Sequence, residues 1–447
     1  MGRYAGALML EAFRAHIANI TKDDGKHKFS LESVLEMGAV SQALSLLHGA
    51  IQTQRQIILG GDYDCDGMSG TALVLYFLRH VIKHPKLAYI IPRRNTDSYG
   101  MSVELLEEYA QKRRLVRTRY AQGQLAGGEP LDFHNSLFLT IDNGATILDA
   151  VCDFLHAHNT PLILSDHHEF LEGRIPACDA FVHPLLSDNH PFHGISGACV
   201  GYLLMLAYAK RYHIKMRPQD WTYMQVLAGL STIGDMMDLS TPYNRHLVQR
   251  MDHTLQTSMP ANLAQLYQLK SRSYPQKYKL SMLSWDIIAP INAVGRMDGI
   301  EGCVHCSVVV DLLSNTEANP HYAHLLLQAH QQRKDLIAQT QESLKAVVCG
   351  GVVHAGGAIA RGLMGLIANQ LLEQHASRMS LCWRYEQESI EASLRSKEID
   401  LIALLGHLQT SGINVMGGGH KRACGMVFES QQDFQDALIY LERHHAF

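Results

Sequence analysis

The sequence predicts an α/β protein in which a doubly wound, mostly parallel sheet is joined by a long helix to a smaller α/β domain. Short apolar runs alternate with amphipathic helical segments over the first two-thirds of the chain, a pattern typical of parallel strands with crossover helices. A polar segment without glycine follows, and a second alternation begins after it. The 447 residues accommodate two or three domains of about 100–200 residues each.

The strands of the larger domain are predicted from its apolar runs. The first, at 56–60, precedes an acidic turn containing glycine and a helix over 71–83. The remaining strands are predicted where apolar runs end near Pro, Asp, Gly or His, at 87–91, 137–141, 162–164 and 180–182. Because ligands of such sheets gather beyond the carboxyl ends of the strands, that edge is the candidate site.

The sequence divides into three segments. Apolar residues at mixed three- and four-residue spacing between 319 and 345 predict one long connecting helix. We therefore place a first domain at 1–316, the connecting helix at 317–346 and a second domain at 347–447.

Composition and charge exclude several classes of protein. With 47% hydrophobic and 18% charged residues, the chain is neither disordered nor fibrous. A net charge of −4 means that any nucleic acid must be held by a local basic groove. We expect no membrane association, because no apolar run reaches the roughly 18 residues that span a bilayer, and the N-terminal segment, with Glu11, Arg14 and His16, is no secretory signal.

The nine cysteines are dispersed singly, except for Cys303 and Cys306. An odd, dispersed set without a signal is typical of reduced thiols in a cytoplasmic protein. The pair has the spacing of half a zinc site, but no second pair follows, so we expect buried thiols there.

Acidic residues and histidines are predicted at four strand or helix ends. They are Asp64 with Asp66, Asp142, Asp166-His167-His168 and Asp235. Each alone has an ordinary explanation as a turn, a surface pair or a helix cap. Together they predict a pair of divalent cations, with Mn²⁺ favoured over Mg²⁺ by the imidazoles. Two ions about 4 Å apart are a common device for phosphoester hydrolysis.

In this order, the four elements resemble the motifs of the DHH phosphoesterase superfamily. The matching stretches are 61–67, 142–144, 166–168 and 233–235. Within the superfamily the chain is similar to the RecJ family of single-strand-specific 5′→3′ DNA exonucleases, at 92–94, 99–100, 290–297, 362–368, 393–396 and 418–425. The resemblance runs from about residue 30 to residue 428 and implies a DHH domain followed by a DHH-associated, substrate-binding domain.

The resemblance also implies residue roles. Asp64 and Asp142 would hold a first metal ion with Asp62 close by, and a second ion would be held by Asp66, Asp142, His167 and Asp235. His168 would contact the scissile phosphate, and Arg296 would neutralise charge on the phosphoryl oxygens. With Asp142, these two form the expected catalytic set. The expected substrate-binding residues are Arg94, Ser393, Arg395, Ser396, Gly418, Gly419 and His420.

The implied activity is hydrolysis of single-stranded DNA from its 5′ end to 5′-mononucleotides by a two-metal mechanism, in DNA repair or recombination. The expected cofactor is Mn²⁺, or Mg²⁺, with two ions per site. RNA is not excluded as a substrate, because residue types alone do not show whether the site accepts or rejects the 2′-hydroxyl of RNA. We expect a cytoplasmic monomer that works with a single-strand-binding protein or a helicase.

Three features depart from the patterns of the superfamily. Members acting on small phosphoesters carry a histidine four residues before Asp64, where this chain has Gly60, which favours a polymer substrate. The chain ends about twenty residues after the glycine–histidine motif, where RecJ continues into an oligonucleotide-binding barrel, so we expect a weaker grip on long strands. Basic residues between 100 and 137 would either extend the DNA track or form a solvated helix face; they are Lys112, Arg113, Arg114, Arg117 and Arg119.

Two alternative functions remain. One is a DHH phosphodiesterase acting on short oligonucleotides, nanoRNase-like, or on cyclic dinucleotides. The other is a non-catalytic scaffold, which the complete set of matched ligands disfavours.

Overall fold

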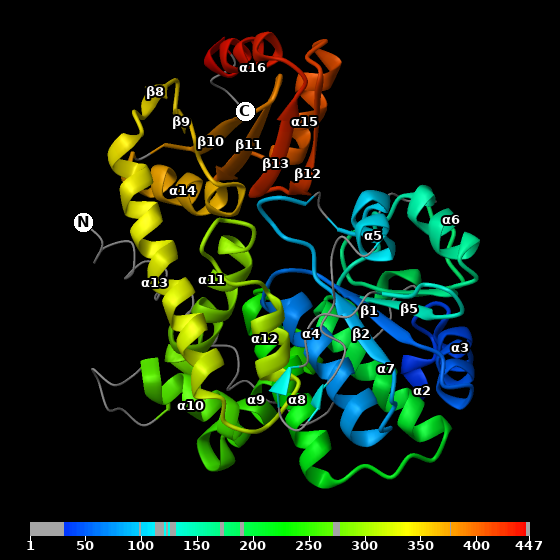
Figure 1. The fold of residues 1–447 in the computed structure, drawn as a ribbon. Helices are drawn as coiled ribbons and strands as arrows, with labels where there is room; N and C mark the ends of the chain where they lie inside the picture. The colour runs from blue at the N-terminus through cyan, green and yellow to red at the C-terminus, as the bar shows by residue number, and fades with distance from the viewer. Residues whose placement is uncertain are drawn as a thin grey trace. The chain divides into compact units, whose positions relative to one another are not determined.

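The computed structural model describes residues 31–97, 100–111, 120–121, 124–125, 131–169, 174–187, 192–270, 278–375 and 377–443. The chain forms two compact units, one covering Leu10–His330 and the other containing Gln331–Phe447 (Figure 1). The division falls within the long helix α13 (Pro320–Ser343). The basic residues Lys112, Arg113, Arg114, Arg117 and Arg119 lie outside the described residues, as does Tyr99.

The first unit contains a sheet of five parallel strands. In chain order they are β1 (Ile57–Gly61), β2 (Leu87–Ile90), β5 (Leu137–Ile141), β6 (Leu162–Ser165) and β7 (Ala180–Val182). Their order in the sheet is β2-β1-β5-β6-β7, and every pairing is parallel. All five strands are buried throughout, as expected for a sheet covered on both faces.

Alternate residues of each strand enter two different cores. Ile57 and Leu59 contribute to the core shared with α3 (Val40–Gln52), α4 (Cys65–Tyr76), α7 (Gly197–Arg211) and α8 (Pro218–Gly234). Ile58 contributes to the core shared with α5 (Val103–Ala110) and α6 (Asp149–Ala157) (Figure 1). The doubly wound α/β fold predicted from the sequence is therefore confirmed.

The predicted start of the first crossover helix was wrong. We expected an irregular acidic turn and a helix from residue 71, but α4 begins at Cys65. Asp64 caps it, because its Oδ1 accepts the backbone N–H groups of Asp66 at 2.9 Å and Gly67 at 3.1 Å. The helix thus extends to the end of β1, with Asp66 in its first turn.

The rest of the first unit is mainly helical. Its remaining elements are α2 (Leu31–Val34), a π-helical turn η2 (Phe77–Val81), a short hairpin of β3 (Tyr120–Ala121) and β4 (Gln124–Leu125), η3 (Pro184–Leu186), α9 (Pro242–Ser258), α10 (Ala261–Lys270), η5 (Leu280–Met282), η6 (Ser284–Ile288), α11 (Ala289–Met297) and α12 (Ser307–Leu313). Within the described part of the chain, no helix combines the length and apolar character needed to cross a bilayer.

The second unit contains a six-stranded mixed sheet of order β12-β13-β11-β10-β9-β8. The strands are β8 (Val347–Cys349), β9 (Val352–Gly356), β10 (Met379–Glu386), β11 (Ser389–Ser396), β12 (Val415–His420) and β13 (Ala423–Phe428). Only β9 and β10 pair in parallel. Its core joins one face of the sheet to α15 (Leu401–Thr410) and α16 (Gln431–Arg443). On the other face, Ser380 donates a hydrogen bond to the Ala368 carbonyl of α14 (Arg361–Gln374).

Leu139 tests the importance of the central strand, because it lies in β5 and is fully buried. We expect Leu139→Ala to lower the free energy of unfolding by about 2–5 kcal/mol through the cavity that it leaves. The matched control is Leu148→Ala, whose side chain is 59% exposed and whose effect should stay within about 0.5 kcal/mol. Denaturant titration followed by circular dichroism measures both, and equal effects would contradict the core assignment.

Candidate active site

The predicted site residues of the first unit follow neighbouring strands at their carboxyl ends. Asp62, Asp64 and Asp66 follow β1, Asp142 follows β5, and His167 with His168 follow β6. Because β1, β5 and β6 are adjacent in the sheet, these side chains meet at one edge. The C-terminal end of α8 adds Asp235.

Three overlapping groups of side chains have the spacing of metal ligands. They are Asp62, Asp64 and Asp142; Asp66, His167 and Asp235; and Asp142, His167 and His168, each with ligand atoms within 4.8 Å of one another. Asp142 and His167 each belong to two groups. The structure thus brings together every residue predicted to hold a metal ion, and Asp142 belongs to both the first and the third of these groups.

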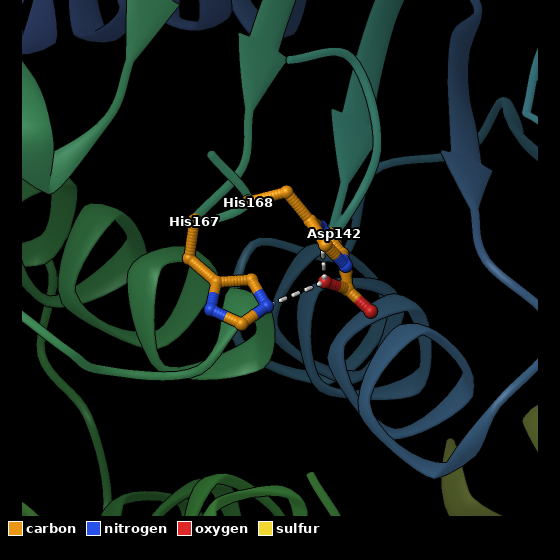
Figure 2. Close-up of side chains that lie close together, drawn as sticks. All are labelled: Asp142, His167 and His168. Atoms are coloured by element: carbon orange, nitrogen blue, oxygen red, sulfur yellow. Dashed lines mark ion pairs between the residues drawn. The ribbon is translucent and has the colours of Figure 1, made fainter. Parts of the chain in front are cut away.

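His167 lies at the centre of this cluster. Its Nε2 is 3.2 Å from Asp142 Oδ1 (Figure 2) and 3.6 Å from the Oδ2 atoms of both Asp66 and Asp235. Both His167 Nε2 and Asp142 Oδ1 are buried without a hydrogen bond. Buried polar atoms normally have partners, and carboxylate oxygens with one imidazole nitrogen suit Mn²⁺ or Mg²⁺. The donor set therefore fits a divalent cation.

Burial makes the carboxylates costly to ionise. It raises the pKa of Asp62 to about 7, with repulsion from Asp64 as the next cause. It also raises the pKa of Asp66, and it raises the pKa values of Asp142 and Asp235 well above the usual range, with a further rise from neighbouring carboxylates. Cations bound among these groups would favour their ionised forms.

The N-terminus of α7 supports two of these carboxylates. The backbone N–H groups of Gly197 and Ala198 donate to Asp66 at 2.8 and 2.7 Å, where the helix dipole favours negative charge. A Cβ atom at Gly197 would overlap the Asp142 carboxylate, so only glycine permits this approach. We did not identify this contribution from the sequence, although Ser196-Gly197 before an apolar run is a recognisable helix start.

Asp142 also has an unusual backbone. Its φ of +58° lies in the left-handed region, which is uncommon for residues other than glycine and is tolerated best by Asn and Asp. The Asp142 N–H donates to the Ser165 carbonyl at 3.0 Å, which ties this conformation to the end of β6.

Asp166 organises the turn that carries the two histidines. It accepts hydrogen bonds from the backbone N–H groups of Ala145 (2.6 Å), His167 (2.7 Å) and His168 (3.2 Å), and it lies 2.8 Å from His168 Nδ1. Burial raises the pKa of Asp166, but the His168 hydrogen bond and charge lower it to about 2. Asp166 is thus a positioning residue rather than a predicted ligand.

The same contact sets the state of His168. Burial lowers the pKa of His168, but the hydrogen bond with Asp166 and nearby carboxylate charge raise it to about 10. The imidazolium donates from Nδ1 to Asp166 and keeps its Nε2–H for another acceptor. His183, which had no predicted role, lies beneath this turn, with its Nε2 at 3.0 Å from the His168 carbonyl.

The two predicted arginines lie near the segment 62–66 that follows β1: Arg296 is part of helix α11, which contacts this segment, and Arg94 lies against Tyr63. Asn292 of this helix accepts the Cys65 N–H at 2.8 Å, and a Cβ atom at Gly295 would overlap the Tyr63 carbonyl. Asn95 donates to the Arg296 carbonyl at 2.9 Å. The Arg94 guanidinium lies 4.7 Å from the centre of the Tyr63 ring, a cation–π distance.

The other predicted substrate-binding residues lie in the second unit. Arg395 of β11 donates to Ser393 Oγ at 3.1 Å. Ser393 and Gly418 flank Gly425 of β13 in register, which aligns them across the sheet. Gly418, Gly419 and His420 are exposed on the edge strand β12. Ser396 differs, because its Oγ accepts the N–H groups of Glu398 and Ile399 in the following turn.

The cysteine pair has no metal-binding partners among the described residues, since no potential ligand group there includes it. Cys306 is buried, Cys303 is partly buried, and both are free thiols.

Comparison with known proteins identifies the domains. The DHH family, N-terminal domain, matches residues 56–234, and the DHHA1 domain matches residues 345–444. The single-stranded-DNA-specific exonuclease RecJ of Haemophilus influenzae is 26% identical over 96% of this chain and 73% of its own length. RecJ of Escherichia coli is 25% identical over 89% of this chain and 67% of its own length.

Solved structures show the same fold. A crystal structure of exonuclease RecJ bound to manganese superimposes with a TM-score of 0.68 at 23% identity, covering 94% of this chain and 96% of that one. RecJ of Thermus thermophilus in complex with Mn²⁺ gives a TM-score of 0.71 at 21% identity, covering 98% of this chain and 61% of that one. With its DHH and DHHA1 domains in this order, the chain belongs to the DHH superfamily, and over most of its length it is similar to RecJ.

Proposed function

We propose that this protein is a metal-dependent exonuclease that degrades single-stranded DNA from the 5′ end to 5′-mononucleotides, in DNA repair or recombination. Its DHH domain and RecJ relatives make it a hydrolase of phosphodiester bonds. The observation that carries the proposal is the cluster of three overlapping ligand groups, joined through Asp142 and His167, at the carboxyl edge of the sheet. Clusters of this kind are found in enzymes that cleave phosphoesters with two metal ions.

The cofactor in this proposal is a pair of Mn²⁺ or Mg²⁺ ions. Asp62, Asp64 and Asp142 would hold one of them, and Asp66, Asp142, His167 and Asp235 would hold the other. When bound, such ions activate a water molecule and neutralise charge on phosphoryl oxygens.

The side chains of the protein would perform the remaining tasks. His168, held through Nδ1 by Asp166, would donate its Nε2–H to a phosphoryl oxygen. Arg296 would stabilise the negative charge that develops there, since a positioned guanidinium needs no reorganisation during the reaction. Arg94, held against Tyr63, would bind a phosphate of the strand.

The second unit would bind the rest of the strand. Ser393 and Arg395 would hold phosphate, and the exposed Gly418, Gly419 and His420 would let the strand approach the backbone closely. A pocket that accepts a terminal 5′-phosphate would impose polarity. We propose a cytoplasmic monomer that receives its strand from a single-strand-binding protein or a helicase.

Gly60 favours a polymer substrate over a small phosphoester. A Cβ atom at Gly60 would lie 2.7 Å from Cε1 of Phe138. A histidine ligand, which small-substrate members carry at this position, has no room there. The alternative substrates remain short oligonucleotides and cyclic dinucleotides. A scaffold role is disfavoured because every matched ligand position carries a ligand residue.

Asp142→Asn tests the shared ligand. Asparagine keeps the size and tolerates the left-handed backbone, but it loses the charge shared by two ligand groups. We expect more than about 100-fold loss of Mn²⁺-dependent nuclease activity. Replacing residues that only orient metal ligands already lowers metal affinity or activity by about 10–100-fold. Asp149→Asn, at an exposed position of α6, is the control. Activity retained in Asp142→Asn would contradict the proposed site.

A length series tests substrate and polarity. DNA and RNA strands of graded length, labelled at the 5′ or 3′ end, are incubated with the protein and Mn²⁺. We expect DNA to be degraded, with the 5′ label released first as a mononucleotide and long strands accepted. Cleavage confined to dimers through pentamers would favour the short-oligonucleotide alternative, and early release of the 3′ label would reverse the assigned polarity.

The raised pKa values predict how stability depends on pH. Asp62 has a pKa of about 7 in the folded protein against 3.8 ordinarily, so the folded state binds a proton that the unfolded state releases. In the presence of EDTA, stability should therefore fall as pH rises from about 4 to about 7. Mn²⁺ should raise Tm more at pH 8 than at pH 5, because it binds the ionised carboxylates.

Thermal melts at the two pH values measure this effect, and Asp62→Asn should show a shallower decline in EDTA. A wild-type protein whose Tm in EDTA falls between pH 5 and pH 7 no more steeply than that of Asp62→Asn would contradict the prediction.

A further inference from the structure

Two buried serines connect three helices at Asp66. Ser231 of α8 lies with its Oγ 2.6 Å from Asp66 Oδ1, in the first turn of α4. Ser196, the residue that caps α7, lies with its Oγ 2.6 Å from Ser231 Oγ. Both serines are fully buried. Neither belongs to a ligand group, and the proposed chemistry does not use them.

The direction of these hydrogen bonds follows from the groups involved. An ionised carboxylate only accepts, so the Ser231 hydroxyl donates its single proton to Asp66. The Ser196 hydroxyl must then donate to Ser231 Oγ. Ser196 Oγ in turn accepts the Cys199 N–H at 3.3 Å. The chain of donors runs one way, from the α7 backbone to Asp66, and each bond polarises the next.

Ser231 also connects two predicted ligands. Its carbonyl accepts the Asp235 N–H at 2.9 Å, while its side chain donates to Asp66. Asp66 and Asp235 both face His167 Nε2 at 3.6 Å. One serine therefore sets the place of Asp235 through its main chain and the orientation of Asp66 through its hydroxyl.

We propose that Ser231 is a positioning residue that orients Asp66 for divalent-metal binding, and that the Ser196 hydroxyl acts on Asp66 in part through Ser231. This inference rests on the proposed function, because it assumes that Asp66 is a metal ligand. Asp66 Oδ1 accepts both Ser231 and the Ala198 N–H, while Oδ2 accepts the Gly197 N–H and faces His167. Losing the Ser231 donor would remove one of the two hydrogen bonds that Asp66 Oδ1 accepts, and the carboxylate would be held less firmly toward the other ligands.

Mn²⁺ titration of the purified full chain tests the proposal without reference to activity. Isothermal titration calorimetry of wild type, Ser231→Ala, Ser196→Ala and the double variant gives their Mn²⁺ dissociation constants. We expect Ser231→Ala to weaken Mn²⁺ binding about 10–100-fold and Ser196→Ala to weaken it less. The double variant should lose less affinity than the two single losses combined, because part of the effect of Ser196 passes through Ser231.

Thr232→Val is the matched control. Thr232 is the next residue of α8 and is equally buried, but its hydroxyl donates to the Ala228 carbonyl of its own helix. We expect its Mn²⁺ affinity to equal that of wild type. Melting temperatures measured in EDTA separate loss of fold from loss of metal binding, and Ser196→Ala reports on the same hydrogen bonds if Ser231→Ala does not fold.

The outcomes distinguish this inference from the proposed function. A wild-type protein that binds no Mn²⁺ would overturn both. Wild-type binding with an unchanged Ser231→Ala, an equal loss in Thr232→Val, or additive losses in the double variant would overturn the positioning role alone.

Discussion

The site depends on the concentration of buried negative charge at one edge of a parallel sheet. Asp62, Asp66 and Asp142 are at most 4% exposed, and their neighbours Asp64 and Asp235 add two more carboxylates. Charges this close repel one another strongly where water is excluded. The fold must therefore hold them by other means, and the elements around the site are arranged to do so.

Three structural features provide that support. The N-terminus of α7 directs two backbone N–H groups at Asp66, Asp64 caps α4, and Asp166 gathers backbone and imidazole donors at the histidine turn. In each case a carboxylate is placed against N–H groups rather than against another carboxylate. Asp142 Oδ1 and His167 Nε2 are buried without such partners, which is why cations suit the space between them.

Much of the site was predictable because its residues are local in sequence. Each short motif follows a strand or helix whose apolar pattern is strong, and parallel strands bring their carboxyl ends to one edge. The start of α4 was predicted wrongly. Asp64 was interpreted as a metal ligand, and the sequence does not show that the same side chain also caps the helix. The roles of Asp166 and His183 were also missed. Residue type alone does not distinguish an aspartate or histidine that binds a metal from one that only holds the ligands in place.

By itself the sequence determined the α/β class, the order of the strands along the chain and the set of carboxylates and imidazoles available for chemistry, because these depend on local pattern and on residue type. The tertiary structure decided which of those residues are shared between ligand groups and which residues hold them in place. Asp142 is shared because β5 lies between β1 and β6. Ser231 reaches Asp66, and Ser196 reaches Ser231, because α7 and α8 pack against α4 and against each other. Contacts between segments so distant in the chain arise only from packing.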